Sequence, residues 1–455
     1  MQVIIALFAV FAPHISATTG CQLSCVVLAV LAMTGRVTML NISRWTSKGG
    51  SYRTLQRFFN TVLPWPTLFW VFFRTHLLDR ESEYIIAGDE TIKPKTGAKT
   101  FGLDRFFSST HGKAIPSLSF LAVSLVSVKE RRSYPMAIEQ IVRDDTSSAS
   151  AAKQDATPKE PLKRPRGRPK GSKNRDKTDV VIIGVLKQLQ IMIKTLLSKV
   201  GGAIQLRYLV LDGYFGHNNG GQMARQCDLH LISKLRSDAA LFWQPTDEKE
   251  GPGRPRLYGE RFNPQQIDPK YRISIQTDGN IRTDIYQGHL RNQKFPELLN
   301  AVCLLKTNLK TKKQSHILLF SSDLALDAEK IIDYYSLRFQ IEFNFRDAKQ
   351  YWGLQDAMNV NKEPVNTAAN LSMFMIHVSA KLMEKDRWQN PEYSVLDLKS
   401  RYRGLKYVHE TLKMLPQKPE PIVIQQITEH LGSIGAIHHT QPRIIGEGIE
   451  IHQAI

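Results

Sequence analysis

The sequence predicts an α/β fold in which a mixed-sheet core is interrupted by a mainly β insertion and flanked by helical N- and C-terminal regions. Apolar, strand-like runs at 84–87 and 115–128 precede a segment of helical length and periodicity at 180–200. Residues 237–322 contain short alternating or apolar runs that are separated by turn residues, which is typical of β structure. Both ends of the chain show mainly helical patterns.

Length and charge narrow the class of protein. The chain has 455 residues, enough for two or three domains, and its 42% hydrophobic content is ordinary for a globular protein. Its 61 Lys and Arg against 42 Asp and Glu give a net charge of +19. This balance favours a polyanionic partner, with nucleic acid as the first candidate and a membrane surface as the weaker alternative.

Cysteine usage and the apolar N-terminus bear on the compartment. The four cysteines are Cys21, Cys25, Cys227 and Cys303. They form no CxxC pair, so we expect free thiols in a reducing compartment. The apolar runs 3–12 and 25–33 are each far shorter than the roughly 20 residues that span a bilayer. No basic segment precedes the first run, so we expect neither a signal peptide nor a membrane span.

The most informative segment of the chain is 335–349. It contains Tyr335, Arg338, Glu342 and Lys349, at spacings of three, four and seven. In one continuous α-helix these spacings place the four side chains within about 60° of one another. The expected flanking residues are Tyr334, Ile341, Phe345 and Ala348 on one side and Phe339 and Phe343 on the other, and those expected to face water are Asp333, Ser336, Gln340, Asn344 and Asp347.

This polar stripe has two interpretations. Arg338 and Glu342 are an i,i+4 pair, so an ordinary internal salt bridge is the simpler one. The stripe, however, extends to Tyr335 and Lys349 along an aromatic side of the predicted helix. Charges are rarely placed there unless they are paired, metal-bound or catalytic, and the combination favours a functional role.

Two aspartates are candidate partners of Glu342. Asp89 follows the apolar run YIIAG, and Asp212 follows LRYLVL, so we expect each at the end of a buried strand. Each aspartate alone is weak support, because many strands end in a turn aspartate. Together, two strand-end aspartates and a helix glutamate would give oxygen ligands for two Mg²⁺ or Mn²⁺ ions. One ion would activate a water or a 3′-hydroxyl, and the other would stabilise the leaving oxygen.

These residues resemble a known signature. Tyr335, Arg338, Glu342 and Lys349 resemble the Tyr-Arg-Glu-Lys signature of DDE transposases of bacterial insertion sequences. The segments 88–91 (Gly-Asp-Glu-Thr) and 211–214 (Leu-Asp-Gly-Tyr) resemble the looser first and second aspartate motifs of that family. The resemblance implies a ribonuclease-H-like core. It also implies Asp89, Asp212 and Glu342 as catalytic metal ligands, and Tyr335, Arg338 and Lys349 as contacts to DNA phosphates.

The same resemblance implies a function. It is Mg-dependent cut-and-paste transposition, in which a homodimer binds the terminal inverted repeats of its element, cleaves the DNA and transfers the strands. The expected location is the bacterial cytoplasm, in association with the nucleoid. The expected domains are a helical DNA-binding region (1–80), a first part of the catalytic core (81–236), a β-rich insertion (237–322), a second part of the core with the Glu helix (323–384) and a helical C-terminal region (385–455).

A basic segment separates the strand-like run at 115–128 from the helical pattern at 180–200. Residues 144–178 have almost no large apolar side chain, which predicts a disordered linker. Within 153–177 there are ten basic residues and three acids. The residues expected to contact DNA are Arg164, Arg166, Gly167, Arg168 and Lys170, which resemble an AT-hook that enters a narrow minor groove. A solvated linker that merely attracts phosphate remains the alternative.

Two other functions remain open from the sequence. A non-catalytic DNA-binding protein of the AT-hook type would use the basic segment, but it leaves the spacing of Tyr335 to Lys349 unexplained. A metal-dependent nuclease on the same fold would cleave DNA without joining ends. Strand transfer separates this nuclease from a transposase.

Overall fold

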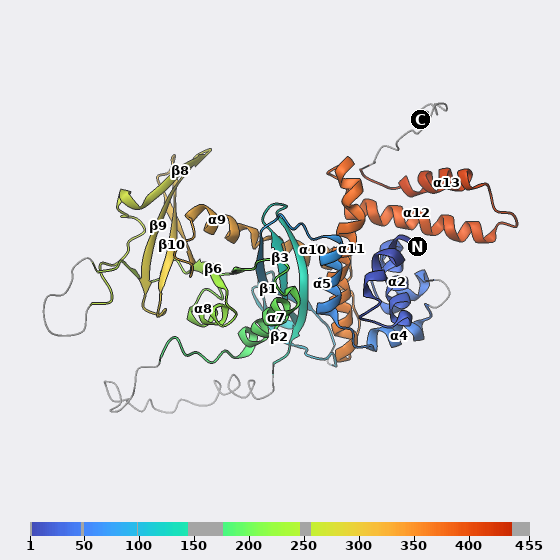
Figure 1. Ribbon diagram of the computed structural model, residues 1–455, viewed down its shortest axis with the longest axis horizontal. Helices are drawn as coiled ribbons and strands as arrows, with labels where there is room; N and C mark the ends of the chain where they lie inside the picture. The colour runs from blue at the N-terminus through green and yellow to red at the C-terminus, as the bar shows by residue number, and fades with distance from the viewer. Residues whose placement is uncertain (1, 47–49, 98, 144–175, 246–255, 439–455) are drawn as a thin grey trace.

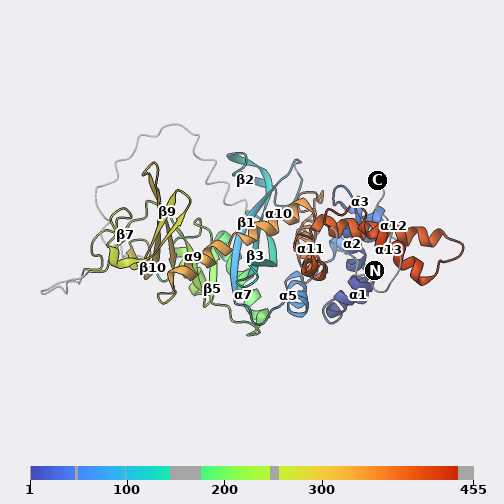
Figure 2. The same cartoon turned by 90° about the horizontal axis from the view of Figure 1, so that it is seen from above.

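The computed structural model describes residues 2–46, 50–97, 99–143, 176–245 and 256–438. The molecule is elongated, with a β-rich end, a central mixed sheet and a helical end (Figures 1 and 2). The basic segment with Arg164, Arg166, Gly167, Arg168 and Lys170 lies outside the described residues.

One sheet runs through the described part of the chain. Its order is β2-β3-β1-β5-β6-β11-β10-β9-β7, with β4 beside β3 and β8 beside β9. The strands are β1 (Tyr84–Pro94), β2 (Asp104–Ser108), β3 (Lys113–Ser127), β4 (Arg132–Ile141), β5 (Tyr208–Leu211), β6 (His230–Leu235), β7 (Leu241–Phe242), β8 (Arg272–Asp278), β9 (Ile281–Asn292), β10 (Leu298–Asn308) and β11 (Gln314–Ser321).

The strand directions define the core. β1, β3 and β4 pair in antiparallel fashion, whereas β5 and β6 extend the sheet from β1 in parallel. The strands β8 to β11 are antiparallel neighbours, and β11 pairs with β6, so the mainly β segment continues the same sheet. This confirms the predicted mixed α/β class with a mainly β insertion.

Helices cover both faces of the central sheet and form the helical end (Figure 1). They are α1 (Gln2–Phe8), α2 (Ala17–Ala32), α3 (Met39–Trp45), α4 (Tyr52–Asn60), α5 (Trp65–His76), α7 (Gly184–Val200), α8 (Asn218–Arg225), α9 (Ala328–Leu337), α10 (Gln340–Gln350), α11 (Lys362–Gln389), α12 (Val395–Met414) and α13 (Pro421–Ser433). Ile85 and Ala87 of β1 belong to the same core cluster as residues of α9, α10 and α11, whereas Ile86 belongs to the cluster that includes α7.

The N-terminal apolar runs are part of the protein core. Phe8 and Phe11 pack against Phe72 of α5 and Phe374 of α11, with ring centroids 5.9–6.2 Å apart. The polar stretch 18–20 between these runs lies within α2, and Ser16 caps that helix by accepting a hydrogen bond from the Thr19 amide. None of the helices in the described residues is both long and apolar enough to cross a membrane.

Candidate active site

Asp89 lies in the middle of a strand and not at its end. The expectation that the strand stops at Asp89 is wrong, because β1 keeps pairing with β3 as far as Pro94. Side chains alternate along a strand, so Asp89 shares its face with Ile85 and Ala87, which are packed with α9 and α10. The carboxylate therefore projects from the sheet towards these two helices.

Asp212 follows β5 directly, as expected. β5 pairs with β1 in parallel as far as Gly88 opposite Leu211, so the next residues along the two strands are Asp89 and Asp212. The Asp212 carboxylate accepts a hydrogen bond from the Tyr214 amide at 3.1 Å, which is ordinary turn geometry. The turn packs tightly on β6, since a Cβ at Gly216 would lie 2.3 Å from the Lys234 carbonyl oxygen.

The predicted single helix through 335–349 is two helices. α9 ends at Leu337 and α10 begins at Gln340. Between them the amides of Phe339 and Glu342 bond three residues back, at 3.1 and 3.0 Å, which is the tighter 3₁₀ pattern. The junction contains neither Gly nor Pro, so no local sequence signal marked the break.

Arg338, at this junction, joins two of the candidate acids. Its guanidinium donates to Asp89 at 3.1 Å and to Glu342 at 3.2 Å. Only 14% of the Arg338 side chain and 18% of the Asp89 side chain are exposed, whereas Glu342 is 41% exposed. The Arg338 guanidinium also lies 5.9 Å from the centre of the Tyr335 ring. The structure thus brings Tyr335, Arg338 and Glu342 together with Asp89.

The charges of these groups act on one another. Burial raises the pKa of the Asp89 carboxyl to about 6; Arg338 opposes this rise, and the nearby charges of Asp212 and Glu342 add to it. Burial alone would lower the pKa of Arg338, but the carboxylates led by Asp89 raise it overall. Burial also raises the pKa of Tyr335, whose hydroxyl interacts with Arg338, Asp212 and Asp89. A cationic species is therefore strongly favoured between the acids.

The Arg338 guanidinium lies between the carboxylates of Asp89 and Glu342. Among the described residues, no three Asp, Glu, His or Cys side chains lie close enough together to hold a metal ion. The donor set nevertheless fits Mg²⁺ or Mn²⁺, since it consists of carboxylate oxygens whose mutual repulsion already requires a positive charge. Lys349, further along α10, is half-buried, burial lowers its pKa, and no ion pair joins it to another described residue.

Some residues around the stripe differ from expectation. Phe339 and Phe343 are 49% and 36% exposed, so they do not wall the stripe from water. Asn344, expected on the water-facing side, is buried and donates to Ser133 at 2.7 Å and to Ser124 at 3.4 Å. Both differences follow from the way α10 lies across β3 and β4, which the helix sequence alone does not reveal.

Two cations near the site were missed by the sequence reasoning. Lys93 and Lys95 follow Asp89 by four and six residues, and both ammonium groups donate to the carbonyl oxygen of Ala357. Their even spacing from Asp89 along a strand was the signal that could have found them, because it places all three side chains on one face.

Comparison with known protein families adds to this geometry. A family model described as a DDE superfamily endonuclease matches residues 10–288, which is more than half of the chain. The chain belongs to this family. No curated protein matches it. The match includes Asp89 and Asp212, whereas Glu342 and the rest of the Tyr335–Lys349 stripe lie beyond it.

Membership of the DDE endonucleases indicates the class of reaction. The order β4-β3-β1-β5-β6 is the ribonuclease-H-like core of such an enzyme, with Asp89 on β1 and Asp212 directly after β5. The family membership implies a nuclease that acts on DNA and, as these enzymes generally do, uses divalent metal ions. The net charge of +19 suits a DNA substrate.

Proposed function

We propose that this DDE endonuclease is the transposase of a bacterial insertion sequence, of the type with the Tyr-Arg-Glu-Lys signature. It would bind the terminal inverted repeats, cleave the DNA and transfer the strands. The observation that supports this is the position of Arg338, which links the acid of the first aspartate motif, 249 residues away, to the glutamate of the signature. A signature that arose by chance would have no reason to meet Asp89.

The three acids would have distinct positions in the reaction. Asp89, Asp212 and Glu342 would hold two Mg²⁺ or Mn²⁺ ions, which supply an activated water or 3′-hydroxyl and stabilise the leaving oxygen. Asp89 and Asp212 are fixed by the sheet, because both lie on adjacent parallel strands. Glu342 is on α10 and is more exposed, so its side chain can approach a bound DNA strand.

The cations of the stripe would hold the DNA strand. Arg338 can exchange its carboxylate partners for a phosphate, because a guanidinium binds both kinds of oxygen in the same bidentate manner. Lys349 has no competing ion pair among the described residues and would contact a second phosphate. Tyr335 would donate its hydroxyl to the same backbone. Such contacts fix the scissile phosphate beside the carboxylates.

Cleavage of a duplex that carries the inverted repeat found beside the gene is the deciding experiment. The parent protein should cleave it and join it to target DNA only with Mg²⁺ or Mn²⁺. Asp89→Asn, Asp212→Asn and Glu342→Gln should each lose at least about 100-fold in cleavage rate while still binding the duplex. Glu329→Gln, on the exposed side of α9, is the matched control and should cleave normally. Normal cleavage by Glu342→Gln would refute the assignment.

The same assay separates the remaining alternatives. Cleavage without strand transfer would identify a nuclease, and binding without either reaction would favour the AT-hook alternative. Deletion of 153–177, which includes Arg164, Arg166, Gly167, Arg168 and Lys170, should weaken binding and reduce its salt dependence. Sedimentation of the protein with two repeat ends should give a complex of two chains, as expected for a homodimer.

A further inference from the structure

A second group of positive side chains lies at the seam between the central sheet and the helical end. It surrounds the single carboxylate of Asp356 and consists of Arg36, Lys93, Lys95, Lys399 and Arg403; we call it the cationic cluster. Arg36 precedes α3, Lys93 and Lys95 are at the end of β1, and Lys399 and Arg403 are on α12. Three segments far apart in sequence therefore contribute charge to one place.

Asp356 does not neutralise this cluster. Its carboxylate lies 3.5 Å from the Arg36 guanidinium and also accepts a hydrogen bond from the Val37 amide at 3.0 Å. Lys93 and Lys95 instead donate to one neutral carbonyl oxygen, that of Ala357, at 2.8 and 3.0 Å. Two ammonium groups on one carbonyl oxygen repel each other, and burial together with this repulsion lowers the pKa of Lys93 to about 7.

The two cations of α12 have a structural explanation, but it covers only part of the charge. Lys399 donates to the Val30 carbonyl at 2.8 Å and Arg403 to the Ala32 carbonyl at 3.3 Å, so they bind the C-terminal end of α2. A helix end carries only about half a negative charge. Arg36 pairs with Asp356, whereas Lys93 and Lys95 have only the neutral Ala357 carbonyl oxygen as their hydrogen-bond acceptor among the described residues, so the cluster keeps an excess of positive charge.

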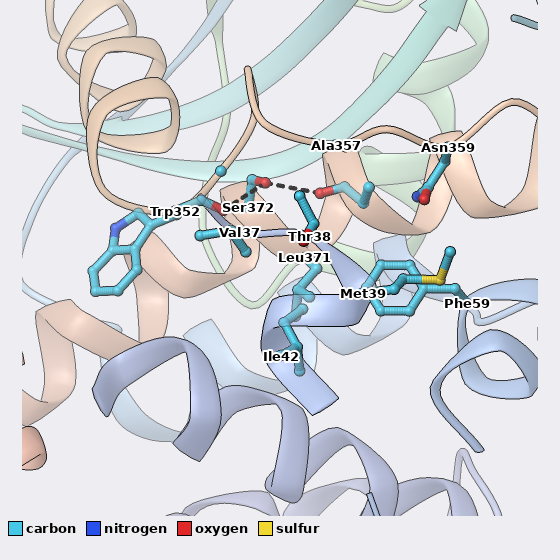
Figure 3. Close-up of a pocket in the computed structure, with 12 residues that line it drawn as sticks. Val37, Thr38, Met39, Ile42, Phe59, Trp352, Ala357, Asn359, Leu371 and Ser372 are labelled. Carbon is cyan, nitrogen blue, oxygen red and sulfur yellow. Dashed lines mark hydrogen bonds between the residues drawn. The ribbon is translucent and has the colours of Figure 1, made fainter. Parts of the chain in front are cut away.

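The seam beneath the cluster is closed to small molecules. Val37, next to Arg36, lies beside Trp352 and Ala357 at a pocket of about 10 Å³, which is room for one water (Figure 3). Lys93 is itself buried, with 4% of its surface exposed. Arg36 is 66% exposed along its side chain, and Lys95 is half-buried. An anion would therefore bind at the surface, where it would contact Arg36 and Lys95. The buried Lys93 would lie beneath them and contribute to the positive potential.

Two lysines of the cluster follow Asp89 along the chain, on the same face of the sheet. Along β1, Lys93 and Lys95 lie about 13 and 20 Å from Asp89, on the same face of the strand. Along α10, Lys349 lies about 10 Å from Glu342. The chain that follows α10 reaches Ala357, whose carbonyl oxygen both lysines contact. A DNA strand has a phosphate every 3.4 Å of helix axis, so these distances correspond to about four to six base pairs.

We propose that the cationic cluster is a second phosphate-binding site, which holds the backbone of duplex DNA about four to six base pairs from the phosphate that is cleaved. The proposal rests on the proposed function for the position of the cut. Duplex DNA is the partner that fits, since its backbone places phosphates at regular intervals that match the spacing from Asp89 to Lys93 and Lys95 along one face.

The test compares two double variants. Arg36→Gln/Lys95→Gln removes the two accessible cations of the cluster, and Lys310→Gln/Lys313→Gln removes two exposed cations from the β10–β11 turn. Binding of a 30-base-pair duplex without divalent metal is measured at several salt concentrations. The cluster variant should lower the salt slope by about 1 to 2, whereas the control should leave it unchanged. Thermal melting checks that the parent and the cluster variant are both folded. Equal salt slopes for the two folded proteins would overturn the proposal.

The position of the contact is tested with a neutral methylphosphonate placed at single sites of a repeat-end duplex. Substitution four to six base pairs from the cut should weaken binding by the parent protein several-fold and have no effect on the cluster variant. Equal losses for the two proteins would show that the cluster does not contact these phosphates. A parent protein that binds in this register but never cleaves would refute the proposed function alone. If inorganic phosphate stabilises only the parent and the salt slopes are equal, the cluster is a site for free phosphate, and the proposal fails.

Discussion

Arg338 lies 3.1 Å from Asp89, although 249 residues separate them in sequence, and the same guanidinium contacts Glu342 at 3.2 Å. The Nε–H of Arg338 is buried and has no hydrogen-bond partner among the described residues. The ion pair therefore leaves one donor unsatisfied, which lowers the cost of moving Arg338 to another anion. We interpret it as the DNA-free arrangement of the site.

Arg338→Ala should separate metal binding from catalysis. Without the guanidinium, Asp89 and Glu342 have no cation between them, so Mn²⁺ should bind the DNA-free protein several-fold more tightly. Cleavage should nevertheless fall about 100-fold, because the phosphate contact is lost. Mn²⁺ affinity is measured by calorimetry and cleavage on a repeat-end duplex. Arg346→Ala, which changes an exposed arginine of α10, should alter neither. Weaker Mn²⁺ binding by Arg338→Ala would contradict this interpretation.

Asn344 should be important for anchoring α10. Its amide is buried and donates to Ser133 and Ser124, so Asn344→Ala removes the partner of two buried hydroxyls. We expect the free energy of unfolding to fall by about 1–3 kcal/mol. Urea unfolding followed by circular dichroism measures it. Gln350→Ala, at the exposed end of the same helix, should stay within about 0.5 kcal/mol of the parent, and an equal loss in both variants would argue against a specific anchor.

The spacing of the stripe predicted correctly that three of its side chains lie together. Tyr335, Arg338 and Glu342 lie close together, as the helical spacing predicts. The tight turn at Phe339 leaves Arg338 and Glu342 on the same side of the two helices. Asp89 and Asp212 are also neighbours, because each is the residue after the last pair in the parallel register of β1 and β5. Both predictions depend on local sequence patterns. One is the helical period of the stripe, and the other is an apolar run that precedes an acid.

What the sequence did not predict depends on contacts between distant segments. The break between α9 and α10 has no Gly or Pro to mark it, and Arg338 at that break is held by Asp89 from another element. The burial of Asn344 depends on Ser133, which is 211 residues away. Propensity and periodicity carry no information about such pairs. The helices and strands near the site were therefore predicted more accurately than the contacts between them.

Gly353 should be needed to dock the N-terminal helices. Its φ is +80°, and an added Cβ would lie 2.3 Å from Cβ of Val37. Gly353→Ala therefore combines left-handed strain of about 1–2 kcal/mol with a clash of about 1–3 kcal/mol. Gly279→Ala isolates the first effect, since Gly279 has a φ of +55° and open space around it. Urea unfolding should show a clearly larger loss for Gly353→Ala, and similar losses would mean that Val37 moves without cost.

His377 should make the folded state sensitive to acid. It is fully buried among the rings of Phe69, Phe72 and Phe374, and the backbone of Pro135 is a polar neighbour. Burial, with a smaller contribution from the charge of Arg132, lowers its pKa to about 3. The unfolded chain takes up this proton near pH 6.5 and the folded chain only near pH 3. The stability that depends on neutral His377 is therefore present above pH 6.5 and lost as the pH falls towards 3.

His377→Phe removes this titration. The unfolding free energy of the variant should rise relative to the parent by about 1.4 kcal/mol for each pH unit between pH 6 and pH 4. Urea unfolding at pH 7, 6, 5 and 4 measures the difference, and His430→Phe on the exposed side of α13 should follow the parent at every pH. A change in packing alone would shift the stability of His377→Phe equally at all four values. A constant difference would therefore mean that the buried imidazole takes up its proton without unfolding the protein.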